Sequence, residues 1–279
     1  MNIFLTGATG YIGSAVAAAL RNANHEVAAL ARPDADTQFL RDIGAVLIGG
    51  DLETLPSLHD QLAGYDAFIH IAQARQNTVV ADRAAVDTFL SLRGHFVYTS
   101  GVWVAGNTKS ADESTPVNPL PIVAWRPAHE ELVLAAGGAV IRPGCVYGGK
   151  QSLCADWFAA AEQNRATQLV GDGTNRWAMV NVHDLTDLYL RAVEQKAKGV
   201  LHGIDDTRET LDECVRAVGA KAEHIPLEVA RETMGPFADA LAVDQTITSA
   251  KTREQTGWNP ARTFTSSLEE QWREWKGQA

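Results

Sequence analysis

The sequence has few cysteines and no long apolar run. Its three cysteines, Cys145, Cys154 and Cys214, are too few and odd in number for a disulfide framework, so we expect a reducing compartment, with the cytoplasm as the default. No segment approaches the roughly 20 consecutive apolar residues that a membrane-spanning helix needs. The apolar N-terminal segment lacks a basic region and is interrupted by glycines, so it reads as structure rather than as a signal peptide.

Positive charge is also in deficit. The chain has 24 Lys and Arg against 34 Asp and Glu, a net charge of −10. Broad binding to nucleic acid draws its affinity from basic side chains on phosphates, so the composition argues against it. No metal-type spacing of Cys and His occurs. With 279 residues and 46% hydrophobic content, we expect one large core, with or without a smaller lobe.

Short apolar runs alternate with longer amphipathic ones up to about Gly149, which predicts βαβ units around a parallel sheet. The predicted strands are Ile3–Leu5, Val27–Leu30, Ala45–Ile48, Ala67–Ile71, His95–Thr99 and Ala139–Arg142, with a further strand at Val200–Ile204. The predicted helices are Ser14–Arg21, Asp34–Asp42, Thr78–Leu92, Val123–Ala136, Leu153–Gln163 and Asp184–Glu194. Short helices around Pro226, Gly235 and Pro236 indicate a small C-terminal lobe.

A glycine-rich turn lies between the first predicted strand and helix. It reads Thr6-Gly7-Ala8-Thr9-Gly10-Tyr11-Ile12-Gly13. In a dinucleotide fold one glycine allows the tight turn, one lets the backbone approach the pyrophosphate, and one lets helix and strand pack closely. Because strand and helix flank the motif, it predicts a dinucleotide site rather than a flexible loop.

Arg32 follows the second predicted strand, where an acidic residue would accept the ribose 2′-hydroxyl of NAD. A guanidinium can instead form two parallel hydrogen bonds with a 2′-phosphate. The position therefore favours NADP(H) over NAD(H), with a solvated surface arginine as the alternative.

Ordered motifs make the whole chain resemble the extended and atypical branches of the short-chain dehydrogenase/reductase superfamily, which include NAD(P)-dependent epimerase/dehydratase proteins. Beside the glycine turn, the motifs are Gly50–Leu52, His70–Ala72, Phe96–Ser100, Arg142–Gly148, Asp172-Gly173, Val180–Leu185, Ser249–Lys251 and Gly257–Pro260. The resemblance implies an α/β, doubly wound parallel-sheet Rossmann fold with a smaller, mostly C-terminal substrate lobe. The implied division is 1–149 plus 179–204 for the dinucleotide-binding domain and 150–178 plus 205–279 for the substrate lobe.

The resemblance also implies site residues. Those expected to bind the cofactor are Gly7, Thr9, Gly10, Tyr11, Ile12, Gly13, Arg32, Asp51, Leu52, Ile71, Ala72, Thr99, His129, Pro143 and Gly144. Those expected near the substrate are Trp103, Trp125, Tyr147 and Arg176. The oligomeric state stays open, although many relatives pair through a helix of the strand-four to strand-six region, which would give a homodimer.

The family's catalytic residues are missing. Active members carry Tyr and Lys four residues apart on a helix, where the ammonium lowers the phenol pKa and the tyrosine moves a proton. Here Trp125 stands at the tyrosine and His129 at the lysine. The usual Ser or Thr falls on Gly101, with Ser100 one place earlier. An indole does not titrate usefully, so the substitute candidates are His129 and Ser100.

Three functions stay open. The first is an NADP(H)-dependent oxidoreductase acting on a small carbonyl or related substrate, with His129 or water supplying the proton. The second is a catalytically silent NADP(H)-sensing or regulatory protein, which the joint loss of Tyr, Lys and Ser favours. The third is a nucleotide-sugar epimerase or dehydratase, which ranks last because that chemistry relies on the missing tyrosine.

Overall fold

The computed structural model describes residues 1–278, which fall into two compact units. The first, unit 1, consists of Met1–Ser100, Ala128–Ile141 and Thr186–Leu201. Unit 2 consists of Gly101–Pro127, Arg142–Leu185 and the chain from His202 onward. The predicted division assigns the cofactor to one part of the chain and the substrate to the other. The two compact units do not test which ligand each part binds, so this division stays a prediction.

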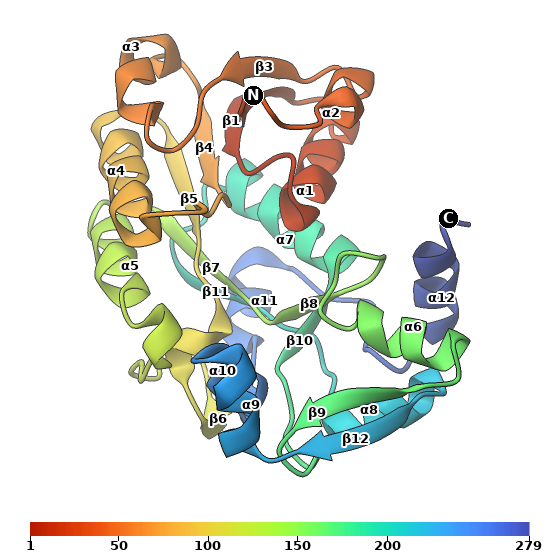
Figure 1. Cartoon of the computed structure of the whole chain (residues 1–279). Coiled ribbons are helices and arrows are strands. Elements are labelled where there is room, and N and C mark those ends of the chain that lie inside the picture. The colour runs from red at the N-terminus through yellow and green to blue at the C-terminus, as the bar shows by residue number, and fades with distance from the viewer. Residues whose placement is uncertain (279) are drawn as a thin grey trace. The chain divides into compact units, whose positions relative to one another are not determined.

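A seven-stranded parallel sheet organises the described chain, in the order β11-β7-β5-β4-β1-β2-β3 (Figure 1). The strands are β1 Asn2–Thr6, β2 Glu26–Ala31, β3 Val46–Gly49, β4 Ala67–His70, β5 His95–Thr99, β7 Ala139–Pro143 and β11 Gly199–Gly203. Their apolar runs suit burial on both faces. The chain moves outward in opposite directions from β1, so β1 and β4 form a topological switch point, where doubly wound folds bind ligands. The predicted Rossmann fold is confirmed.

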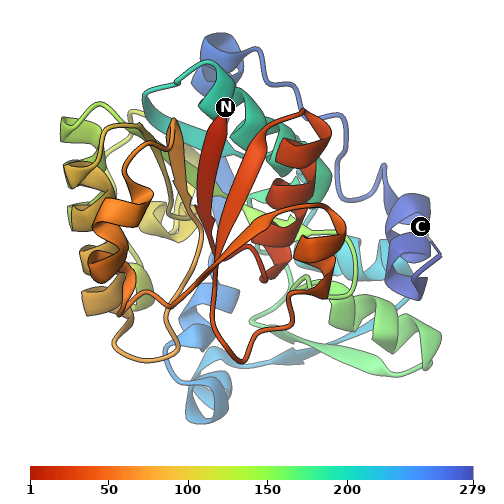
Figure 2. The same cartoon turned by 90° about the horizontal axis from the view of Figure 1, so that it is seen from above.

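Helices cover both faces of this sheet. Figures 1 and 2 show α1 (Tyr11–Asn22) and α7 (Val182–Glu194) on one face, and α4 (Thr78–Ser91) and α5 (Arg126–Ala135) on the other. The shorter elements of unit 1 are α2 Gln38–Asp42, η1 Leu55–Leu58 and α3 His59–Leu62.

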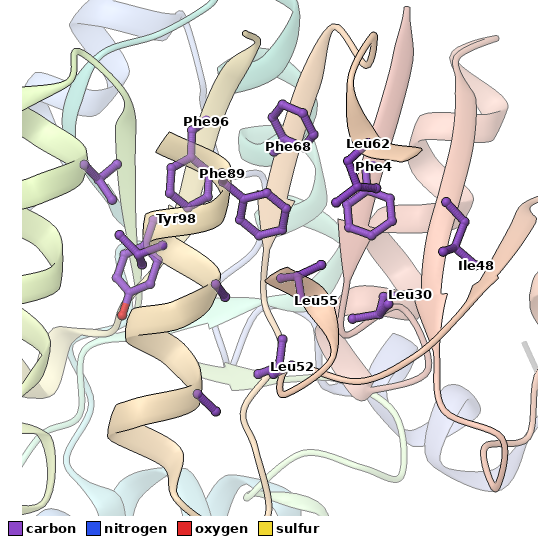
Figure 3. Packing of buried hydrophobic residues seen from close by; sticks show 14 of the residues in the cluster. Phe4, Leu30, Ile48, Leu52, Leu55, Leu62, Phe68, Phe89, Phe96 and Tyr98 are labelled. Carbon is purple, nitrogen blue, oxygen red and sulfur yellow. The ribbon is translucent and has the colours of Figure 1, made fainter. Parts of the chain in front are cut away.

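An aromatic layer fills the space between α4 and the sheet in unit 1. Phe4, Phe68, Phe96 and Tyr98 from the strands surround Phe89 of α4 (Figure 3). The rings of Phe68 and Phe89 stack with centroids 5.2 Å apart. Full burial of such a side chain contributes about 1.5–3 kcal/mol, so this layer fixes α4 on the sheet and with it any polar residue that α4 carries inward.

Unit 2 contains small parallel sheets, β10-β8, β12-β9 and β13-β6, and many short helices. The strands are β6 Thr108–Ala111, β8 Cys145–Tyr147, β9 Ala166–Val170, β10 Met179–Asn181, β12 Lys221–Ile225 and β13 Gln245–Ile247. The helices are η2 Val102–Ala105, η3 Pro121–Val123, α6 Ala155–Glu162, α8 Leu211–Val218, α9 Leu227–Met234, α10 Phe237–Leu241, α11 Ala250–Thr256 and α12 Leu268–Lys276. Its core is aromatic: Trp157 stacks on Trp177 at 5.8 Å and meets Phe264 edge-on.

Several predicted helices differ from the structure at their starts, and the largest difference is at α2. Asp34–Asp42 was expected to be helical, whereas α2 begins only at Gln38. The amide of Ala35 bonds to the Arg32 carbonyl in a turn, and the Asp36 carboxylate accepts the amide of Gln38. Such local hydrogen bonds from aspartate compete with a helix.

Across residues 1–278, no helix combines the length and the apolar character that crossing a membrane requires.

Candidate cofactor site

The predicted glycine turn links β1 directly to α1. Gly7 has φ +80°, and a Cβ there would lie 2.7 Å from the amide nitrogen of Ala72. A Cβ on Gly13 would lie 2.0 Å from the Gly7 carbonyl oxygen. Any larger residue at either position would force the backbone apart. No side chain caps α1 at Gly10, which leaves amides of its first turn for an anionic group.

A cavity of about 710 Å³ in unit 1 opens beside this turn. Of the residues predicted to bind the cofactor, those that line it are Gly7, Thr9, Gly10, Tyr11, Ile12, Gly13, Arg32, Asp51, Leu52, Ile71 and Ala72. The volume lies within the roughly 300–1,000 Å³ of small-molecule sites. The glycine cradle, the uncapped helix and the cavity together fit a dinucleotide.

Further lining residues were not predicted. They are Leu30, Asp34, Gly50, Glu53, Gln73, Ala74, Arg75 and Gln76. Most of them follow β2, β3 or β4, and the carboxyl ends of parallel strands meet at one edge of a sheet. Applying that rule to the residues after each predicted strand would have identified most of these lining residues from the sequence.

Charged groups gather at one part of the cavity. Arg32 Nε donates to Asp34 Oδ1 over 3.1 Å, and Arg75 Nη1 lies 3.5 Å from Asp34 Oδ2. The hydrogen bond and charge of Arg32 lower the pKa of Asp34, so this carboxylate is ionised at neutral pH. The cavity therefore presents two guanidinium groups with an aspartate between them.

The Asp51 carboxylate accepts hydrogen bonds from the turn that follows it. Its Oδ1 accepts the amides of Glu53 and Thr54, at 3.0 and 2.8 Å. Hydrogen bonds from Thr54 lower the pKa of Asp51. The carboxylate thus holds the loop after β3 in place, and Leu52 is buried beside it.

Four predicted cofactor residues do not line this cavity. In unit 1, Thr99 Oγ1 hydrogen-bonds the hydroxyl of Tyr189 at 2.7 Å, and His129 is buried with Nδ1 2.6 Å from Asp82 Oδ2. In unit 2, Pro143 ends β7, and a Cβ on Gly144 would lie 2.5 Å from the carbonyl oxygen of Ala178. Their roles toward a cofactor stay predictions.

Ser100, which follows β5 directly, is the other predicted catalytic residue. It is 8% exposed, and its amide bonds to the Ile141 carbonyl at 2.8 Å. Its hydroxyl is buried and has no hydrogen-bond partner within residues 1–278. A buried orphan hydroxyl is uncommon and needs an explanation such as an absent ligand or water.

The two tryptophans predicted to lie near a substrate belong to unit 2. Trp103 packs edge-on against Phe237 with centroids 6.0 Å apart. The Arg126 guanidinium lies 4.6 Å from the ring centroid of Trp125, a cation–π contact. Both rings therefore have contacts within their own unit.

Tyr147 and Arg176, also in unit 2, are the remaining substrate candidates. Tyr147 is fully buried, and its hydroxyl donates to Asp205 Oδ2 over 2.7 Å. Arg176 Nε donates to the Arg208 carbonyl over 2.8 Å. Roles for these residues toward a substrate stay predictions.

Three known proteins are similar to this chain in sequence. An uncharacterized protein, C2A9.02 of Schizosaccharomyces pombe, is 28% identical over 93% of this chain and 95% of its own. The ceramide reductase of Caulobacter vibrioides is 28% identical over 93% and 86%. A 4-hydroxy-2-methyl-3-oxo-4-farnesyl-3,4-dihydroquinoline-1-oxide ketoreductase of Stigmatella aurantiaca is 28% identical over 83% and 78%.

A solved structure has the same fold. The dTDP-glucose 4,6-dehydratase of Bacillus anthracis, in complex with NAD, superposes with a TM-score of 0.83 at 18% identity, covering 100% of both chains. The sequence model of the NAD dependent epimerase/dehydratase family matches residues 3–204, which include the glycine turn, the seven-stranded sheet and every residue that lines the cavity. A nicotinamide dinucleotide cofactor is implied by that match. Fold, cavity and sequence thus lead to one conclusion: the chain belongs to the NAD dependent epimerase/dehydratase family.

Proposed function

We propose that this protein is an NADP(H)-dependent oxidoreductase acting on a small carbonyl or related substrate. The observation that carries the proposal is the cavity beside the glycine turn, with Arg32 and Arg75 on its wall. Both guanidiniums suit a 2′-phosphate, since Arg binds phosphate through paired, charge-assisted hydrogen bonds. The uncapped first turn of α1 would hold the pyrophosphate.

The reductase assignment has separate support. Two of the relatives named above are a ketoreductase and a ceramide reductase. The bound nicotinamide would supply or accept hydride. From the chain itself, the orphan hydroxyl of Ser100 would donate a hydrogen bond to the substrate oxygen, and His129 would exchange the proton.

Asp34 makes the cofactor preference testable. Its carboxylate competes with a 2′-phosphate for Arg32, yet the same carboxylate could accept a ribose 2′-hydroxyl. Calorimetric titration with NADPH, NADP, NADH and NAD separates these readings. We expect Arg32→Glu to weaken NADPH binding by roughly 10-fold or more, as for a lost charge-assisted bond.

Two further variants sharpen this test. Asp34→Asn should strengthen NADPH binding, because it frees Arg32. Arg83→Glu is the matched control, since Arg83 pairs with Asp87 on the exposed side of α4 and does not line the cavity. NADH preferred by the wild type, and lost in Asp34→Asn, would overturn the NADP(H) assignment.

Turnover is tested with a panel of ketones, aldehydes and conjugated enones, following NADPH oxidation. Ser100→Ala should reduce the rate while leaving NADPH affinity within a few-fold of wild type, and His129→Ala should reduce the rate as well. Trp125 at the tyrosine position favours a second candidate, a silent NADP(H)-sensing protein. Tight NADPH binding without turnover of any panel member would favour that candidate.

A further inference from the structure

A buried carboxylate lies at the centre of unit 1. Asp82, on α4, is 3% exposed. Its oxygens meet three side chains: His129 Nδ1 at 2.6 Å, the Tyr98 hydroxyl at 2.9 Å and His70 Nε2 at 3.2 Å. We call these residues, with Thr6, the Asp82 cluster. Figure 3 shows the Tyr98 hydroxyl at the end of its ring that points away from Phe96.

The cluster extends to the wall of the cofactor cavity. His70 Nδ1 lies 2.6 Å from Thr6 Oγ1, which also accepts the amide of Ala72 at 3.4 Å. Ala72 lines the cavity. Hydrogen bonds therefore run from the cavity wall through Thr6, His70 and Asp82 to His129.

The hydrogen bonds of the cluster fix where the protons lie. An ionised carboxylate only accepts, so each group facing Asp82 must donate to it. The hydrogen bonds of the cluster hold the pKa of Asp82 well below its usual range against the effect of burial. His129 must then carry a proton on Nδ1, and His70 one on Nε2.

We propose that Asp82 is the positioning residue for His129: its carboxylate holds the imidazole as the Nδ1–H tautomer, so that Nε2 is the ring atom that takes up or releases a proton. This inference rests on the proposed function, in which His129 occupies the family's lysine position. A histidine needs such a partner, because either ring nitrogen can carry its proton, whereas an ammonium has no tautomers. The Ser-His-Asp triad uses an aspartate in the same way.

The groups that face the carboxylate come from every element packed around it. They are His70 from β4, Tyr98 from β5 and His129 from α5. Glu130, the neighbour of His129, is also buried. The hydrogen bond to Asp82 would fix the same tautomer in a purely structural cluster, so the effect on kcat, and not the tautomer alone, separates a positioning role from a structural one.

The test is ¹⁵N NMR of the histidine rings, with His129→Gln to assign the signals. In the wild type near neutral pH we expect the Nδ1–H pattern for His129, with and without NADPH. Asp82→Asn should shift His129 toward the Nε2–H tautomer, because an amide can donate to Nδ1. Asp87→Asn, one turn along the same helix, should change nothing. An Nε2–H tautomer in the wild type, or an unchanged one in folded Asp82→Asn, overturns the inference.

A kinetic arm applies once a substrate is found. Asp82→Asn should lower kcat by about 100-fold or more while NADPH affinity stays within a few-fold of wild type. This result is expected if His129 loses its catalytic tautomer while the cofactor site stays intact. A kcat within a few-fold of wild type would overturn the inference. The NMR result needs no turnover, so silence toward every substrate would count against the proposed function alone. If Asp82→Asn fails to fold, an Nε2–H tautomer of His129 in the wild type would still overturn the inference.

Discussion

Each unit of the protein buries an aspartate, and the two respond to burial in opposite ways. In unit 1, burial would raise the pKa of Asp82, but hydrogen bonds from His129 and His70, the charge of His70 and the Tyr98 hydroxyl outweigh it and hold the pKa low. In unit 2, burial raises the pKa of Asp205 to about 6, even though Thr207 and Tyr147 donate hydrogen bonds to it.

The chemistry of the partners explains the difference. Both carboxylates are almost fully buried and both have several donors. Asp82 faces imidazoles, which can carry positive charge, whereas Asp205 faces neutral donors, the hydroxyl and amide of Thr207 and the Tyr147 phenol, and also feels the negative charge of Asp184. Hydrogen bonds from neutral groups do not replace an opposite charge in a low-dielectric interior. Unit 1 therefore favours the ionised form of its aspartate, whereas unit 2 favours the protonated form of Asp205 up to about pH 6.

The largest expected effect comes from removing the unit 1 anion. Asp82→Ala leaves His70, Tyr98 and His129 buried without their acceptor, and loss of one partner from a buried charge cluster costs about 3–5 kcal/mol of unfolding free energy. Urea unfolding followed by far-UV circular dichroism measures it. Tryptophan fluorescence alone would not, because the seven tryptophans all lie in unit 2.

The control for this variant is Asp87→Ala, which breaks an exposed pair with Arg83 on the same helix. It should cost less than about 0.5 kcal/mol. A similar small loss for Asp82→Ala would mean that the cluster contributes little to stability.

Sequence patterns predict unit 1 far better than unit 2. The predicted strands at Val27–Leu30 and His95–Thr99 agree with β2 and β5 to within a residue, because continuous apolar runs mark strands buried on both faces. The short strands of unit 2 were not predicted. Gln245–Ile247 pairs with Thr108–Ala111, more than a hundred residues away in the chain, and three or four residues carry no periodicity of their own.

Local sequence likewise predicts one part of the candidate site and not the other. The glycine turn and Arg32 follow from local sequence, since a turn and a strand end are local features. The Asp82 cluster does not, because its members come from β1, β4, α4, β5 and α5. Asp82 also looks like an ordinary exposed residue of an amphipathic helix, and only the packing of α4 on the sheet turns it inward.

The next largest effect is a change of stability with pH, which tests whether Asp205 in unit 2 keeps its proton on folding. The pKa of Asp205 is about 6 in the folded chain, against 3.8 as its ordinary value. Between about pH 4 and pH 6 the unfolded chain loses this proton while the folded chain keeps it, so stability falls as pH rises. At about 1.4 kcal/mol per pKa unit, the fall amounts to about 3 kcal/mol.

Asp205→Asn should abolish that fall, because an amide does not titrate. Urea unfolding at several pH values, followed by tryptophan fluorescence, measures the slope in each protein. Asp206→Asn, at the exposed neighbouring position, should keep the wild-type slope. Equal slopes in Asp205→Asn and the wild type would show that Asp205 is ionised in the folded chain.

Removing the tyrosine hydroxyl that donates to each aspartate compares Asp82 and Asp205 directly. Tyr98→Phe deletes a hydrogen bond to an ionised group and should cost about 1.5–3 kcal/mol at every pH from about 5 to 8. Tyr147→Phe should cost less at pH 5, where Asp205 is protonated, and more at pH 8, since the lost donor raises the pKa of Asp205 further. A pH-independent cost for Tyr147→Phe would remove the contrast between the two units.

The smallest effect belongs to an ion pair whose histidine is half exposed. His183 Nε2 lies 2.7 Å from Glu274 Oε1, and that hydrogen bond raises the pKa of His183 above its ordinary value. The resulting stability is fully present below the unfolded pKa of about 6.5 and is lost as pH rises through the folded pKa. Because the His183 side chain is half exposed, solvent screens the pair, and Glu274→Gln should cost less than about 1 kcal/mol near pH 6.

That cost should shrink as pH rises through the folded pKa of His183, because the imidazole then loses its charge, and NMR titration should show a lower His183 pKa in Glu274→Gln. Glu269→Gln, at an exposed position on the same helix, serves as the control. A loss as large as that of Asp82→Ala would contradict the comparison, because it would mean that a half-exposed imidazole pair stabilises the chain as strongly as a buried one. The presence or absence of a charged partner would then no longer explain why the pKa of Asp82 is lowered and that of Asp205 is raised.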